Sequence, residues 1–138
     1  MSAPVELYSD RIVRYLRDPE HRSIELRWLG EANAMSEQQF RGAIERLASL
    51  MERDRPPNVL VDMARLEFSP ADDFEQWRQT HIIPRYNKAG VTKFAFILPK
   101  GAPNTVETGT RPAVEGSAVY PTGYFSTRDG AIAWFTTD

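Results

Sequence analysis

Four side chains near the middle of the chain are of types that could do chemistry together. Asp62 ends an apolar run, and a turn then leads to Ser69, Asp72 and Asp73 at the start of an expected helix. A carboxylate at a strand end can serve as a general base, and a serine beside it can be a phosphorylation site. These residues are therefore the first candidates for a catalytic or regulatory corner.

The same corner also has a purely structural interpretation. Ser69 suits a helix N-cap, and Pro70 suits the first helical position. Asp72 and Asp73 would complement the positive end of the helix dipole, and Asp62 would only end its strand. Because this interpretation explains every residue, we expect it ahead of a general base at Asp62.

Histidine offers no stronger route to catalysis. His81 follows Asp73 by eight residues, about 12 Å along a helix, so the two cannot form a hydrogen-bonded dyad. The chain has two His and no Cys, a poor supply of metal ligands. It contains no GxSxG, P-loop or GxGxxG segment. We therefore expect no catalytic residue, no metal site and no cofactor.

Aromatic side chains form a second group of candidates. Phe74, Trp77 and His81 share one stripe of the expected helix, and Phe94 and Phe96 lie in a strand rich in β-branched and aromatic residues. Such a set forms either an ordinary core or the wall of a ligand pocket, since ligand pockets are mostly apolar. Both interpretations remain open from the sequence.

The elements that must position these residues alternate between strands and helices. Alternating apolar and charged residues predict an opening hairpin, and a capping box at Ser36 and Gln39 predicts the start of a long helix. In chain order we expect strands at 11–16 and 23–29, a helix at 37–53, a strand at 58–63, a helix from 70, a strand at 91–98, an irregular connection at about 99–123, a strand, and a final helix capped by Thr127.

This order predicts an α/β fold. Strands joined through helices become parallel neighbours, and the opening hairpin adds an antiparallel pair. We expect a single domain over residues 1–138, with a mixed sheet of about five strands and helices packed mainly on one face.

Composition narrows the class of protein. The 17 Lys and Arg residues are outnumbered by 19 Asp and Glu residues, and the net charge of −2 argues against a nucleic-acid-binding protein. The absence of Cys excludes disulfides, and the amino-terminal residues lack the pattern of a signal peptide. No apolar run is long enough for a membrane span. We therefore expect a cytoplasmic protein.

The order of elements, the strand ending in Asp62 and the terminal segment FSTRDGAIAWF resemble the STAS domain superfamily, in particular its SpoIIAA-like branch of anti-sigma-factor antagonists. The resemblance covers about residues 11–135. It implies a STAS-like domain without enzymatic activity that binds protein partners at the corner of Asp62, Ser69, Asp72 and Asp73. It also suggests a homodimer.

The phosphorylation motif of that branch is not preserved. Ala71 and Asp72 occupy the positions of its two hydroxyl residues, Asp73 replaces its glycine, and Ser69 is out of register. We therefore expect a regulatory domain without the phosphorylatable serine, in which Asp72 is either a phosphoserine mimic or only an acid at a helix start. The alternative is a carrier or sensor of a small apolar, lipid-like ligand beneath the 99–123 connection. An uncharacterised enzyme is the third candidate.

Overall fold

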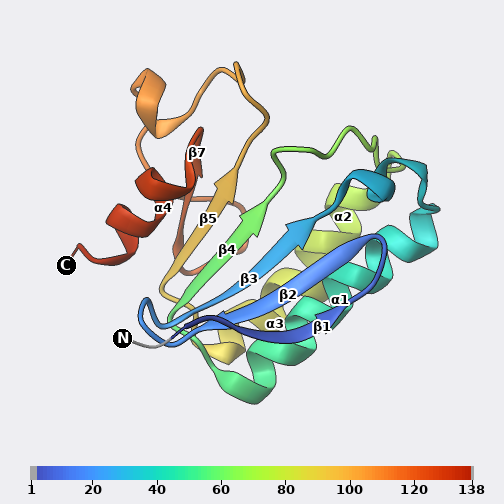
Figure 1. Ribbon diagram of the computed structural model, residues 1–138, viewed down its shortest axis with the longest axis horizontal. Coiled ribbons are helices and arrows are strands. Elements are labelled where there is room, and N and C mark those ends of the chain that lie inside the picture. The colour runs from blue at the N-terminus through green and yellow to red at the C-terminus, as the bar shows by residue number, and fades with distance from the viewer. Residues whose placement is uncertain (1–2, 138) are drawn as a thin grey trace.

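One mixed sheet organises the protein. In the computed structural model, which describes residues 3–137, the seven strands lie in the order β1-β2-β3-β4-β5-β7-β6 (Figure 1). Strands β3, β4, β5 and β7 are parallel, whereas the pairs β1/β2, β2/β3 and β6/β7 are antiparallel. The strand bounds are β1 Val5–Ser9, β2 Val13–Asp18, β3 Ser23–Trp28, β4 Asn58–Asp62, β5 Lys93–Ile97, β6 Ala113–Val114 and β7 Pro121–Phe125. The predicted α/β class and mixed sheet are confirmed.

The expectation of about five strands is wrong, because two short strands form the edges of the sheet. In β1, VELYS, four of the five residues are exposed, and the alternation of Val5, Glu6 and Leu7 is too short to indicate a strand. β6 has only two residues and lies inside the long connection. Both edge strands are too short or too exposed to produce a periodic signal.

The long helix α1 (Glu37–Asp54) and its capping box are both confirmed. Ser36 Oγ accepts a hydrogen bond from the Gln39 amide at 3.1 Å, and Gln39 Oε1 accepts one from the Ser36 amide at 2.8 Å. The buried side of the helix carries the apolar stripe expected from the sequence, namely Phe40, Ile44, Leu47 and Met51.

The second helical segment differs from the expectation at both its start and its middle. It begins at Phe74 rather than near residue 70, and no side chain caps it, so the predicted N-cap role of Ser69 is wrong. The segment consists of α2 (Phe74–Trp77), the π-helical turn η2 (Arg78–Ile82) and α3 (Ile83–Ala89), joined without a break.

The π-helical turn follows from Pro84. Proline has no amide hydrogen, so the carbonyl of Thr80 cannot receive the usual bond from four residues ahead. Instead, the Ile83 amide donates to the carbonyl of Arg78, five residues back. The wider turn lets the helical path continue past the proline, a residue that usually kinks or ends a helix.

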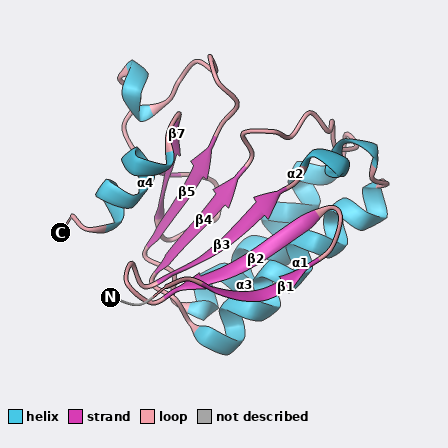
Figure 2. Cartoon of the chain, viewed as in Figure 1, coloured by secondary structure: helices cyan, strands magenta, loops and turns pink. Residues whose placement is uncertain are grey.

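Helices cover the two faces of the sheet unequally (Figure 2). Helices α1 and α3, with the turn η2, bury the larger core on one face. Helix α4 (Arg128–Phe135) covers part of the opposite face, over Leu60, Ala95, Ile97 and Phe125. As expected, Thr127 caps α4, because its Oγ1 accepts a hydrogen bond from the Gly130 amide at 3.0 Å. The described residues contain no helix long and apolar enough to cross a membrane.

The connection from β5 to β7 contains the short 3-10 helix η3 (Val106–Thr108) and β6, and is fastened to the helical layer. Gln79 Oε1 accepts hydrogen bonds from the Ser117 amide and hydroxyl at 2.9 and 2.8 Å. Asn87 bonds the Ser117 carbonyl and the Val119 amide, both at 3.0 Å. Gly116 has a positive φ of 56°, and a Cβ there would lie 2.5 Å from the Gln79 amide oxygen. Glycine suits this position, because any other side chain would force the Gln79 amide to move away.

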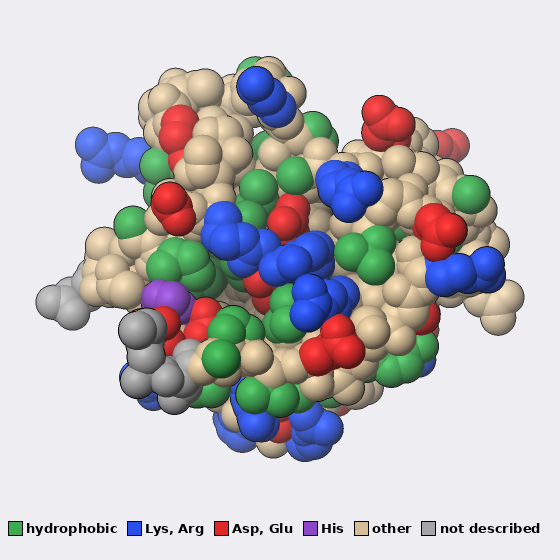
Figure 3. All heavy atoms as spheres, in the orientation of Figure 1, with side chains coloured by type: hydrophobic (Ala, Val, Ile, Leu, Met, Phe, Trp, Pro, Cys, Tyr) green, Lys and Arg blue, Asp and Glu red, His purple; other side chains and the backbone are tan. Residues whose placement is uncertain are grey.

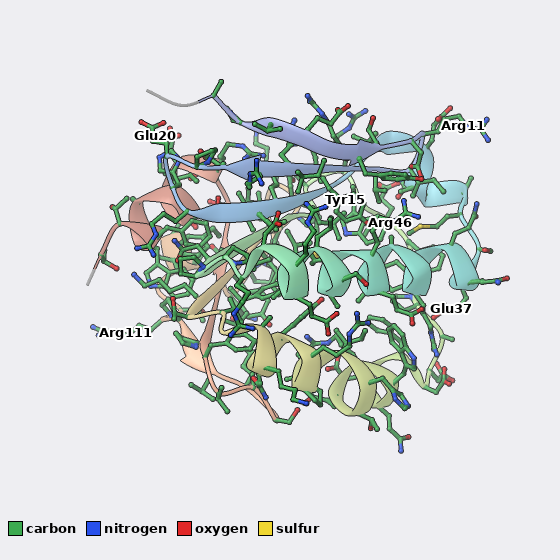
Figure 4. All side chains as sticks on the ribbon, turned by 90° about the horizontal axis from the view of Figure 1, so that it is seen from below. Arg11, Tyr15, Glu20, Glu37, Arg46 and Arg111 are labelled. Atoms are coloured by element: carbon green, nitrogen blue, oxygen red, sulfur yellow. The ribbon has the colours of Figure 1, made fainter. Side chains whose placement is uncertain are left out.

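One buried tyrosine ties the sheet to α1 (Figure 4). The Tyr15 hydroxyl donates to the carbonyl of Ala43 at 2.6 Å, and its side chain is fully buried. Burial raises the pKa of Tyr15, so the phenol stays neutral and remains a donor. Nearby, the Arg46 guanidinium lies 3.7 Å from the centre of the exposed Tyr8 ring.

Tyr15→Phe should lower the free energy of unfolding by about 1–2 kcal/mol, because the Ala43 carbonyl would lose its donor in a buried place. Urea unfolding followed by circular dichroism measures the change. The matched control is Tyr8→Phe, which keeps the ring beneath Arg46 and removes an exposed hydroxyl bonded to Asp10. We expect the control to stay within about 0.5 kcal/mol. Equal losses in the two variants would contradict the role given to the Tyr15 bond.

Candidate functional site

A cavity of about 230 Å³ lies between the sheet and the helices, at the carboxyl ends of the parallel strands. In α/β proteins this end of the sheet is where ligands usually bind. The walls are mostly aliphatic and aromatic, and four polar side chains join them. The lining residues are Leu26, Trp28, Phe40, Ile44, Leu47, Val61, Met63, Leu66, Phe74, Glu75, Arg78, Tyr86, Phe94, Phe96, Leu98 and Tyr124.

Stacked aromatic rings give the cavity firm walls. The rings of Trp28 and Phe40 lie 5.2 Å apart between centroids, and those of Phe40 and Phe74 lie 4.9 Å apart. Across the cavity lining, Phe96 stacks on Tyr124 with centroids 5.5 Å apart. These separations are in the favourable range for aromatic pairs.

An ion pair forms the charged part of the wall. Arg78 donates to Glu75 Oε1 through Nη2 at 2.8 Å and through Nε at 3.1 Å. The Arg78 side chain is 22% exposed, whereas that of Glu75 is 62% exposed, so the arginine is the inner partner. Burial acts to raise the pKa of Glu75, but hydrogen bonds from Arg78 and Gln79 outweigh it and the pKa lies below its usual value.

Tyr86 is a buried residue whose hydroxyl has no hydrogen-bond partner among the described residues. The residue is 3% exposed, and its hydroxyl makes no hydrogen bond to any other described residue. Among the described residues, every side-chain nitrogen or oxygen that is completely shielded from solvent is hydrogen-bonded. The Tyr86 hydroxyl therefore keeps some accessible surface, and Tyr86 is one of the residues that line the cavity. Burial raises the pKa of Tyr86, which keeps the phenol in its neutral, donating form.

Three of the five residues expected in an apolar pocket line this cavity, namely Phe74, Phe94 and Phe96. Trp77 and His81 do not. They lie in a surface hollow with Asp73. The centre of the Trp77 ring is 5.1 Å from the Arg41 guanidinium carbon. The residues that line the cavity also include none from 99–123, although Leu98 and Tyr124 flank that connection.

The inward stripe of the helix has a different spacing from the expected one. Phe74, Arg78, Ile82 and Tyr86 recur every four residues on the side that faces the core. An arginine in the middle of this stripe interrupts the hydrophobic pattern, so the sequence did not point to Arg78, and Tyr86 was expected to face inward but was not among the pocket candidates. The signal that could have found them is the run of four-residue steps that starts at Phe74.

The four acidic-corner residues are not brought together. Asp62 points to the opposite face of the sheet, where it accepts from Arg128 at 3.1 Å, while Asp73 pairs with Arg41 of α1 at 2.6 Å. The Arg41 guanidinium lowers the pKa of Asp73. Ser69 and Asp72 are exposed, and neither side chain bonds another described residue. The geometry offers no convergent acid, base and nucleophile at this corner.

A second polar cluster lies on the open face of the sheet beside α4 (Figure 3). Glu25, only 9% exposed, accepts two hydrogen bonds from Arg128 at 2.6 Å and one from Arg27 at 2.9 Å. Burial acts to raise the pKa of Glu25, but these hydrogen bonds outweigh it and the pKa is lowered. The groove here, about 620 Å³ in volume, is larger than the apolar cavity. Its charges already satisfy one another, so we regard the cluster as structural.

The turn between β2 and β3 holds Asp18, Glu20 and His21 with potential ligand atoms within 4.8 Å of one another. His21 Nδ1 lies 2.6 Å from Asp18 Oδ2, and Asp18 also accepts from the Glu20 amide at 3.1 Å. These bonds close the hairpin turn and account for the grouping without a metal ion.

Comparison of the chain with protein-family models, with curated proteins and with solved structures found no match in any of the three. The function must therefore be argued from the cavity and the polar groups that line it.

Glu25→Gln should lower the free energy of unfolding at pH 7 by about 2–3 kcal/mol, because two arginines would lose a buried carboxylate partner. The pKa of Glu25 is lower in the folded protein, so its contribution is complete above the ordinary value of 4.5 and disappears as the pH falls through the folded value. The difference between wild type and variant should therefore shrink below about pH 4.5. Urea unfolding at several pH values measures it.

The matched control is Glu6→Gln, which removes an exposed carboxylate paired with Arg14 at 2.8 Å. An exposed ion pair contributes little, so we expect a change within about 1 kcal/mol at every pH. A Glu25→Gln effect that is equally small would show that the buried cluster does not stabilise the fold.

Proposed function

We propose that the protein binds a small, largely apolar molecule in the cavity between the sheet and the helices. The observation that carries this proposal is an unfilled, mostly apolar hollow of about 230 Å³ that is walled by side chains of the core and opens to solvent. Ligand pockets in proteins are typically concave and mostly apolar, with a few polar groups in the wall. A small apolar molecule that enters such a hollow gains free energy by leaving water.

Water is a poor occupant for most of this space. Cavities lined by aliphatic and aromatic side chains tend to stay dry, and an engineered apolar cavity of about 150 Å³ binds benzene. The present cavity is larger than that and slightly smaller than a typical drug-sized pocket of about 300 Å³ or more. The expected ligand is therefore about the size of one substituted aromatic ring or a short alkyl chain.

The regulatory function implied by the resemblance to STAS domains is a second proposal. The feature that favours it is Asp72, which is exposed and bonds no other described residue, so it is available to a protein partner. Under this proposal Asp72→Asn should weaken capture of a partner while changing the free energy of unfolding by no more than about 0.5 kcal/mol. Affinity purification with quantitative mass spectrometry and urea unfolding measure the two effects. Unchanged capture would count against a regulatory corner at Asp72.

Native mass spectrometry of the protein purified from cells, followed by titration with 3-phenylpropan-1-ol, tests the binding proposal. We expect either extra mass that leaves on denaturation or a saturable change in the NMR signals of cavity residues such as Trp28 and Phe94. A bare mass together with no saturable response to the alcohol would overturn the proposal.

Leu98→Trp should weaken binding of 3-phenylpropan-1-ol about tenfold or more, because the larger side chain occupies part of the cavity. The matched control is Ile132→Trp, which adds a similar bulk beside α4 and the open-face groove. A larger side chain lowers the free energy of unfolding by about 1–3 kcal/mol at either site. The stability of each variant is therefore measured together with its affinity for the alcohol. If both variants bind as tightly as wild type, the alcohol occupies some other place.

A further inference from the structure

We infer that the ligand of this cavity carries a carboxylate group, which Arg78 and the hydroxyl of Tyr86 bind while the apolar part lies among the aromatic rings. This inference rests on the proposed ligand-binding function and specifies the chemical class of the ligand. Three features of the cavity wall support it, of which two concern Arg78 and one concerns Tyr86.

The first feature is the placement of Arg78. Burying a guanidinium beside an apolar space is costly unless charged or polar partners compensate it. Arg78 uses Nε and Nη2 to bind Glu75, and its Nη1 bonds no other described residue. Arg78 lines the cavity, so a donor remains for a group that enters it.

The second feature is the unpartnered hydroxyl of Tyr86. The residue is only 3% exposed and its hydroxyl bonds no other described residue, so this donor is free to bind a ligand oxygen. Tyr86 lies two four-residue steps after Arg78 on the same inward stripe, and both residues line the cavity.

The third feature is Glu75, whose carboxylate already occupies one edge of the Arg78 guanidinium. Its side chain is mostly exposed, so it can turn into solvent at little cost. The Glu75 carboxylate is thus an example of the chemical group that Arg78 binds. It competes with the carboxylate of an entering ligand for the Arg78 guanidinium. Arginine binds planar carboxylates through two parallel hydrogen bonds, which suits both partners.

The charge of the wall favours a carboxylate over a phosphate. Arg78 is the only Lys or Arg among the lining residues, and Glu75 offsets much of its charge. A dianionic phosphate is normally bound by several cationic or amide donors, whereas one arginine and one phenol match a single negative charge.

The test compares 3-phenylpropanoate with 3-phenylpropan-1-ol by isothermal titration calorimetry at pH 7.5. The two compounds share the ring and the chain and differ in the terminal group. We expect wild type to bind the carboxylate about tenfold or more tightly than the alcohol. Arg78→Gln should bring the two affinities to within about threefold of each other while leaving that of the alcohol nearly unchanged.

Glu75→Gln provides a readout that does not depend on the stability of the arginine variant. Removal of the competing carboxylate should tighten binding of 3-phenylpropanoate about threefold or more and leave the alcohol unaffected. Tyr86→Phe should weaken the carboxylate severalfold with little change in the free energy of unfolding, because the hydroxyl has no partner to lose in the unliganded protein.

The outcomes separate this inference from the proposed function. If neither compound binds wild type at the cavity, the carboxylate inference fails, and the proposed function fails with it when the purified protein also has a bare mass. If both bind wild type with equal affinity, the cavity still takes apolar ligands and the carboxylate inference is overturned. A preference that persists in Arg78→Gln, or weaker carboxylate binding in Glu75→Gln, would also overturn it.

Discussion

Pro84 has no amide hydrogen, and the geometry of the cavity wall follows from that one missing donor. In a regular helix, residues four apart are rotated by about 40° from one another, so a stripe with four-residue steps drifts away from the core. The wider turn at Arg78–Ile82 counteracts this drift, and it keeps Phe74, Arg78 and Tyr86 on one side. π-Helical turns inside α-helices are frequent at functional sites. Here the turn lets a charged side chain share a wall with aromatic ones.

Unequal cover of the sheet explains why its two faces differ in chemistry. Strand β4 is buried on both sides, with Val59 and Val61 in the larger core and Leu60 beneath α4. The eight-residue α4 is too short to cover β2 and β3 as well. The remaining area carries the buried cluster around Glu25, whose arginine partners shield the sheet with charged groups that satisfy one another. On the helical face, the mostly apolar cavity lies at the carboxyl ends of the strands.

The parts of the fold that the sequence predicted are those with strong local patterns. The capping box at Ser36 and the apolar stripe of α1 required no tertiary information, and neither did the alternation in β2 and β3. The exposed β1 had no such pattern. At the candidate site, Phe74, Phe94 and Phe96 could be named because aromatic residues are rarely left in water. Arg78 could not, since its position in an apolar stripe contradicts the rule that predicts such stripes. The Glu25–Arg128 pair joins residues 103 positions apart, which no local pattern reveals.

The fastening of the long connection also bears on how this protein can evolve. Gln79 reaches Ser117 only because Gly116 has no side chain in its way. A side chain at position 116 would collide with the side-chain amide of Gln79 in its present position. A shorter residue at position 79 would lose the hydrogen bonds to Ser117. Neither position can therefore change freely while the other stays as it is. Over a lineage, glycine at 116 and glutamine at 79 should be inherited together or lost together, which would leave a visible covariation between two sites 37 residues apart.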